Sequence, residues 1–172
     1  EAVFFFIVPD VWLTWLALTV REHKKLGIAI IWAVCGAVLG GLLMCVIGGN
    51  VPSQQLADWL DYVPGISQTL VQDVSNQIEK GGISSVFVGI LKGIPYKIYA
   101  SQWGVHHGGL GILVLCSILA RGGRFILSVI VARCIDLFAR KFFIGWESRK
   151  YIVFAIFWTV FYIFYFYHYP LW

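Results

Sequence analysis

Long uncharged apolar runs alternate with short polar segments along the chain. Leu26 to Gly49 is the clearest run, with 24 consecutive residues that carry no charge. A helix rises about 1.5 Å per residue, so this run is long enough to cross about 30 Å of hydrocarbon. Residues 151–172 form another uncharged run, rich in Phe, Tyr and Trp, and its aromatic end is typical of a membrane interface. The pattern predicts transmembrane helices over 26–49 and 151–172.

Two other apolar stretches are interrupted by proline and charge. In residues 1–20, Pro9 and Asp10 lie near the middle, where proline removes a backbone donor and a carboxylate is costly in lipid. In residues 82–104, the interruption is a short polar segment around Pro95. Each half of these stretches is too short to cross a bilayer. We therefore predict two re-entrant hairpins with their tips at the prolines.

The apolar stretch that follows the second predicted hairpin is harder to place. Residues 105–120 predict a transmembrane helix, but residues 125–139 include Arg133 and Asp136, and a basic segment, 140–150, comes next. The positive-inside rule places the basic clusters before residue 26, after residue 120 and in this segment in the cytoplasm. We therefore predict that 125–139 is an interfacial or partly inserted helix that does not cross fully.

Residues 50–80 form the longest polar segment, and it is acidic. Leu70, Val71, Val74 and Ile78 recur in it at helical spacing, which predicts an amphipathic helix resting on the membrane surface. Because acidic loops lie on the side away from the basic ones, the segment is expected to be extracytoplasmic.

The composition excludes most other protein classes. Hydrophobic residues make up 59% of the chain, charged residues only 13%, and the mean hydropathy is +0.80, whereas soluble domains carry about 25% charged residues. The net charge of +4 arises from 13 Lys and Arg and 9 Asp and Glu, and the basic residues are separated by membrane-length runs, which excludes nucleic-acid binding. We predict an all-α integral membrane protein with one membrane-embedded domain over 1–172.

Catalytic and metal chemistry is not indicated. The four cysteines show no CxxC or Cys/His spacing, so buried free thiols are expected rather than zinc ligands or disulfides; they are Cys35, Cys45, Cys116 and Cys134. His106 and His107 are adjacent and would face different sides of a helix. No paired carboxylates and no serine with an identifiable base occur. We therefore predict no enzyme, no metal and no cofactor.

The two halves of the chain share one plan. Each has a proline-broken hairpin followed by a glycine-containing span, and the hairpins enter from opposite sides. This is the inverted repeat from which many transporters build a site near the bilayer midplane, although any short hydrophobic protein could offer two prolines and two helices. The tips carry Asp10 on one side and Lys92 and Lys97 on the other. Such charges are functional candidates, with snorkelling of the lysines to the interface as the alternative.

Three blocks of sequence also resemble a known family. They are Glu1-Ala-Val-Phe-Phe-Phe-Ile-Val-Pro9-Asp10 with the glycine-rich run from Gly36 to Gly49, Phe87-Val-Gly-Ile-Leu-Lys92-Gly-Ile-Pro95-Tyr-Lys97, and Arg121-Gly-Gly-Arg124-Phe125. In this order they resemble the DedA superfamily, also called the VTT or SNARE-associated domain, especially its YqaA-like branch. The resemblance implies two facing re-entrant hairpins, a bacterial inner membrane, and movement of undecaprenyl phosphate or phospholipids.

The resemblance also assigns roles by position. It implies that Glu1 and Asp10 are the acidic hairpin residues, that Lys92 and Lys97 hold the basic positions, and that Arg121 and Arg124 are the later arginines. Two departures stand out, since Ile-Val-Pro-Asp replaces a common Pro-x-Pro and Lys92 stands where arginine is frequent. Lysine binds phosphate without the bidentate fork of arginine, so the preferred head group can differ.

Three functions follow from these observations. The leading hypothesis is a flippase or scramblase for an anionic, phosphate-bearing lipid, with Glu1 and Asp10 in proton coupling or gating. Its expected substrate-binding residues are Lys92, Lys97, Arg121, Arg124, Pro9 and Pro95. The alternatives are a proton-coupled carrier of a small soluble anion, and a non-transporting scaffold that binds partner helices through glycines such as Gly36 and Gly40. Membrane lipids are the expected partners, and the glycine-rich helices could also form a homo-oligomer.

Overall fold

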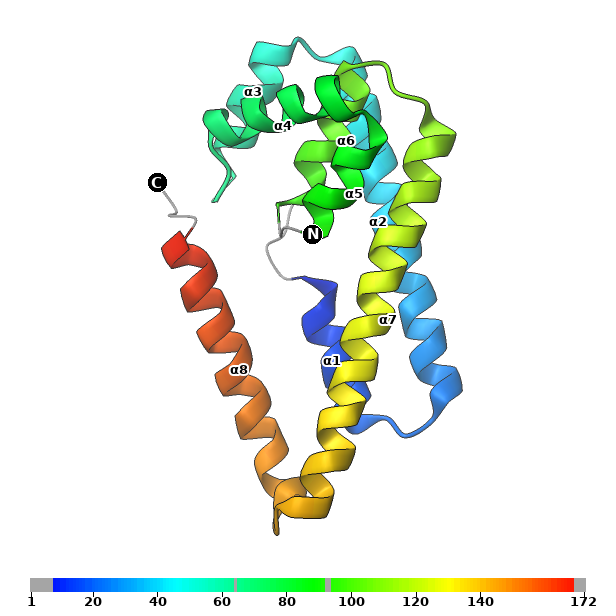
Figure 1. The fold of residues 1–172 in the computed structure, drawn as a ribbon, viewed down its shortest axis with the longest axis vertical. Helices are drawn as coiled ribbons and strands as arrows, with labels where there is room; N and C mark the ends of the chain where they lie inside the picture. Colours follow the sequence, from blue (N-terminus) through cyan, green and yellow to red (C-terminus); the bar gives the residue numbers. More distant parts are fainter. Residues whose placement is uncertain (1–7, 64, 92–93, 169–172) are drawn as a thin grey trace.

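A computed structural model describes residues 8–63, 65–91 and 94–168, and all regular structure in these ranges is helical (Figure 1). The helices are α1 (Pro9–Thr19), α2 (His23–Asn50), α3 (Ser53–Asp61), α4 (Gln68–Gly81), α5 (Ile83–Leu91), α6 (Tyr96–Val105), α7 (Leu110–Phe142) and α8 (Trp146–His168). The all-α prediction is therefore confirmed for the described residues.

Helices α2 and α7 are the long elements of the molecule. In the part of the chain that the structure describes, these two are long and apolar enough to cross a membrane, which weakly supports a membrane protein. They pack against each other along much of their length (Figure 1). Large apolar side chains point outward from both, with Trp32 73% exposed and Leu137 66% exposed. A surface of this kind is unfavourable in water and favourable in lipid.

Helix α7 corrects the predicted division of the third apolar stretch. We expected a transmembrane helix over 105–120 and a separate interfacial helix over 125–139, but residues 110–142 form one helix of 33 residues. The charges that suggested a break lie along its inner face, where Arg121 and Asp136 are each only 1% exposed. The helix continues because protein, not lipid, surrounds these charges. At about 1.5 Å per residue it is roughly 50 Å long, more than the hydrocarbon thickness of about 30 Å.

The ends of the molecule differ in charge. The α1–α2 connection, with Arg21 and with Lys24 and Lys25 in the first turn of α2, lies at the same end as the α7–α8 connection, which follows Arg140 and Lys141 (Figure 1). The acidic helices α3 and α4 lie at the opposite end (Figure 1). Arg121 and Arg124 belong to neither end, because they lie within α7. The positive-inside rule therefore still orients the chain, with the α1–α2 and α7–α8 connections expected in the cytoplasm.

Both prolines that interrupt apolar stretches stand where helices begin. Pro9 is the first residue of α1, and Pro95 is the residue that precedes α6. Proline suits these positions because its missing N–H would have no helical partner there. Helices α5 and α6 flank Pro95 and pack against each other. The other half of the first predicted hairpin, residues 1–7, lies outside the described residues, and the re-entrant placement of both hairpins stays a prediction.

Glycines bring the backbones of α2 and α6 into direct contact. A Cβ added at Gly48 would overlap the backbone carbonyl of Ser101, and one added at Gly104 would overlap the carbonyl of Cys45. One added at Gly41 would overlap the Tyr96 ring, whereas nothing lies within 4 Å of the Cβ position at Gly36. The close helix contact that we predicted around Gly36 therefore occurs further along α2, and its partner is α6 of the same chain.

The predicted amphipathic helix is present as α4, and its apolar face packs on protein. Val71, Val74 and Ile78 of α4 are buried in the core that includes Ile98 and Tyr99 of α6. The Tyr99 hydroxyl donates a hydrogen bond to Gln77 Oε1 at 2.7 Å, which fixes α4 across α6. The apolar face of α4 is therefore covered by protein, and it caps one end of the bundle.

The glycine contact between α2 and α6 yields a test of the fold. Gly48→Leu should lower stability by more than about 3 kcal/mol, because a side chain there meets backbone that cannot move aside. Gly36→Leu is the matched control on the same helix and should change stability by less than about 0.5 kcal/mol. Thermal unfolding in detergent, followed by circular dichroism, measures both. Equal losses for the two variants would contradict the α2–α6 packing.

Candidate functional site

The N-terminal ends of α1 and α6 face each other beside the middle of α7 (Figure 1). Asp10 in the first turn of α1 contacts Arg124 and Ser128, and Tyr96 at the start of α6 contacts Ser117 and Arg121. On α7 the four partners follow one another at spacings of four, three and four residues, so they lie on one helix face. This polar face of α7 is the candidate functional site.

Asp10 has a partner for each carboxylate oxygen. Arg124 Nη2 donates to Oδ2 at 2.7 Å, and Ser128 Oγ donates to Oδ1 at 2.6 Å. The Asp10 side chain is 4% exposed, whereas that of Arg124 is 31% exposed. Its place in the first turn of α1 adds the favourable field of a helix N-terminus. A buried charge is costly without partners, so this ion pair fixes the start of α1 on α7.

One turn away on α7, Arg121 lies against the start of α6. Its guanidinium carbon is 4.9 Å from the centroid of the Tyr96 ring, within the range of a cation–π contact. The Tyr96 hydroxyl is hydrogen-bonded to the Ser117 hydroxyl, and Ser117 Oγ also donates to the Leu113 carbonyl at 2.6 Å. Lys97, the next residue of α6, is 5% exposed. The site therefore holds two arginines close to the starts of two helices.

The structure brings together only some of the residues predicted to act. Asp10 and Arg124, both predicted site residues, form an ion pair across the fold. Pro9 and Pro95 stand at the starts of α1 and α6 and so position the residues that follow them. Glu1 and Lys92 lie outside the described residues.

Three members of the site were not predicted from the sequence. Ser117, Ser128 and Tyr96 contact the charged residues, but none was predicted. Ser128 follows Arg124 by four residues, and Ser117 precedes Arg121 by four. This spacing would have placed the serines on the arginine face if 110–142 had been read as one helix.

A second polar cluster holds the other end of α1. Lys150 Nζ donates to the Leu18 carbonyl at 3.2 Å, and Arg133 donates to the Val20 carbonyl. Cations are favourable at a helix C-terminus, where carbonyl groups lack helical partners. Lys150 also donates to Glu147 Oε2 at 2.6 Å, and this hydrogen bond holds the pKa of the Glu147 carboxyl below its ordinary value. Helix α1 is therefore anchored by charge at both ends.

The turn between α7 and α8 is built around Asp136. Trp146 Nε1 and Arg140 Nε each donate to its carboxylate at 2.8 Å. Gly145 has φ of 79°, a backbone conformation that other residues rarely adopt, and it lets the chain reverse before α8. Asp136, one of the two charged residues in 125–139 that had argued against a crossing helix, thus stabilises this turn.

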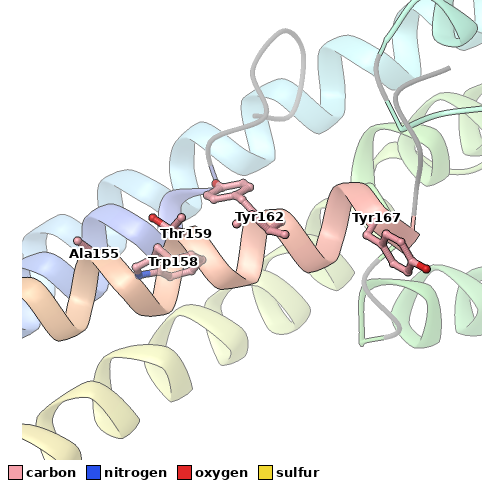
Figure 2. A pocket seen from close by; sticks show the side chains of 6 residues that line it. Ala155, Trp158, Thr159, Tyr162 and Tyr167 are labelled. Carbon is pink, nitrogen blue, oxygen red and sulfur yellow. The ribbon is translucent and has the colours of Figure 1, made fainter.

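Helix α8 diverges from α7, and α1 lies between their lower halves (Figure 1). In addition to Lys150, two aromatic side chains of α8 hydrogen-bond to α1 or its N-cap: Trp158 Nε1 donates to Thr14 Oγ1, and the Tyr162 hydroxyl accepts from the Val8 N–H, both at 3.2 Å. An open hollow of about 810 Å³ runs along the same helix (Figure 2). Among the described residues its lining is one face of α8 and is mostly apolar.

The described residues contain no group of three or more His, Cys, Asp or Glu side chains that could hold a metal ion. The four cysteines are free, as predicted, but only Cys45 is fully buried. Cys35 and Cys134 are exposed on the outer faces of α2 and α7, which corrects the expectation that all four are buried.

No protein-family model, no curated protein and no solved structure matches this chain. The resemblance to the DedA superfamily therefore stays a prediction that rests on the quoted residues.

The buried ion pair generates a stability prediction. Asp10→Asn should lower stability by about 2–4 kcal/mol, because it removes the charge that compensates Arg124. Glu22→Gln is the matched control: Glu22 pairs with Lys25 at 2.8 Å, but both side chains are about two-thirds exposed, at 64% and 65%. Such surface pairs contribute at most about 1 kcal/mol. Chemical unfolding in detergent measures the difference, and equal effects would contradict the buried pair.

Proposed function

We propose that this protein is a flippase or scramblase that moves an anionic, phosphate-bearing lipid across a bacterial inner membrane. The observation that carries the proposal is the Arg124–Asp10 ion pair. Arg124 lies within α7, a helix of membrane-crossing length, and Asp10 lies at the start of α1. Ionised groups at this depth are costly and mark substrate pathways more often than structural contacts. The resemblance to the DedA superfamily supports the same function.

The charges of the site favour an anion. Arg121, Arg124 and Lys97 contribute positive charge, and Asp10 contributes the negative charge that pairs with Arg124. The starts of α1 and α6 add backbone N–H groups and the positive ends of two helix dipoles. Broken helices whose N-termini face an anionic substrate are a known construction of transporters. A phosphate monoester or diester matches this donor set.

Access to the site suggests how a head group binds. The Arg124 side chain is 31% exposed, so a phosphate can reach its guanidinium while Asp10 stays buried. The phosphate then competes with the Asp10 carboxylate for Arg124, and protonation of Asp10 weakens the existing pair. Binding and protonation are coupled in this scheme, as we predicted for Asp10, while the hydrocarbon tail stays in lipid.

The two alternatives make different use of the same residues. A carrier of a small soluble anion would need Arg124 and Asp10 but no contact with a lipid tail. A scaffold would need an open helix surface such as that around Gly36, and the buried ion pair would then serve only to hold α1 on α7.

Transport in reconstituted vesicles tests the proposal. Arg124→Gln should slow transbilayer movement of a labelled phosphatidylglycerol or polyprenyl phosphate by at least about tenfold, the loss of one charge-assisted contact of about 1.4 kcal/mol or more. Arg124→Lys should be intermediate, since lysine keeps the charge and loses the fork. Glu22→Gln, at the exposed pair, is the control and should retain the wild-type rate.

The outcomes separate the functions. Equal rates for wild type and Arg124→Gln would exclude the site. Uptake of inorganic phosphate driven by a pH gradient, without lipid movement, would favour the soluble-anion carrier. Asp10→Asn should change the dependence of the rate on pH, because the variant cannot exchange a proton at this position.

A further inference from the structure

The hollow along α8 is lined mainly by apolar atoms. Its described lining consists of Ala155, Trp158, Thr159, Tyr162, Ile163 and Tyr167, which recur at spacings of three and four residues on one helix face (Figure 2). The Trp158 Nε1 and Tyr162 hydroxyl groups are bound to α1. Because these two polar groups bond to α1, the surface that the hollow offers to a ligand is mainly hydrocarbon.

The position of the hollow determines what can fill it. Helix α8 begins at the turn that ends α7 and runs back while diverging from it (Figure 1). Helix α7 has membrane-crossing length. In a bilayer the space beside α8 is therefore filled by hydrocarbon, not by water. From Ala155 to Tyr167 the helix rises about 18 Å, close to the thickness of one leaflet of about 15 Å. One acyl or prenyl chain fits this length.

Hydrogen bonds connect the lining of the hollow to α1, the helix that carries Asp10. Tyr162, in its lining, accepts the N–H of Val8, the residue that caps α1. Asp10 lies two residues further on and holds Arg124. Trp158 binds Thr14, whose hydroxyl donates to the Asp10 carbonyl at 2.6 Å. A chain in the hollow would thus pass the start of α1 at Tyr162, partway along the lining, on the side where the phosphate is expected.

We propose that the hollow along α8 binds the hydrocarbon tail of the lipid whose head group is bound at Arg124. This inference rests on the proposed function and identifies the substrate as a tailed lipid, which excludes a free phosphate. Because lipid tails are as apolar as the hollow, the gain comes from packing against rigid rings and not from the hydrophobic effect. The hollow therefore orients the tail of a lipid whose head group is bound at Arg124.

Photolabelling of the full chain in lipid vesicles tests the inference. The probe is phosphatidylglycerol with a diazirine on one acyl chain, and adducts are located by mass spectrometry after digestion. We expect adducts on Ala155, Thr159 and Ile163 to exceed those on Ile156, Val160 and Phe164, which do not line the hollow. Equal labelling of both sets would overturn the inference, because it would mean ordinary surrounding lipid. Protection of the lining residues by a second copy of the chain would overturn it as well.

A matched pair of substitutions makes the test sharper. Thr159 and Val160 are adjacent, exposed and nearly equal in shape, but only Thr159 lines the hollow. Thr159→Trp should reduce labelling of Ala155 and Ile163 by about tenfold, as expected when an inserted ring costs a bound chain about 1.4 kcal/mol. Val160→Trp should leave this labelling unchanged. Both variants are first checked for wild-type thermal stability in detergent, and equal labelling in the two would overturn the inference.

Failure of the tail site can be distinguished from failure of the proposed function. If wild type moves no lipid in vesicles but labels the hollow selectively, the proposed function fails and the tail site stands. If wild type moves lipid and Arg124→Gln slows it, while labelling shows no preference, only the tail site fails. Movement of lipid that Thr159→Trp slows and Val160→Trp does not would support both.

Discussion

The fold depends on one requirement: every charge within the apolar body of this protein must have a partner there. Asp10 is almost fully buried, and its two carboxylate oxygens are bound by Arg124 and Ser128. Lys150 and Arg133 bind the carbonyl groups at the other end of α1. An unpaired charge in this environment would cost several kcal/mol. Pairing therefore decides where α1 lies, and α1 in turn positions α8.

The same pairing makes α7 the central helix of the molecule. Its inner face carries Ser117, Arg121, Arg124 and Ser128, which meet the starts of α6 and α1. Its outer face carries large exposed apolar residues such as Leu127 and Leu137. One helix can thus be lipid-facing and still hold a polar site, because its two faces meet different surroundings. The proposed transport site lies on the inner side of this division, whereas the proposed tail site lies along α8.

Much of the fold was predictable from local pattern, since length and charge distribution along a chain are local properties. The uncharged run at 26–49 predicted α2, and helical spacing at 70–78 predicted α4. The break predicted between 120 and 125 was wrong, because charge suggested a boundary that partners across the fold removed. Asp10 and Arg124 were both identified as site residues, but their pairing spans more than a hundred residues of sequence, and no local pattern encodes it.

The sequence by itself determined that the chain is helical and apolar, with two apolar stretches that are interrupted at prolines and few charges to place. Only the tertiary structure decided which charges meet, which glycines touch another backbone, and which apolar faces stay open. The apolar face of α4 is covered by α6, whereas that of α8 borders a hollow. The physical reason is that periodicity reveals that a face is apolar, but packing between distant segments determines what covers it.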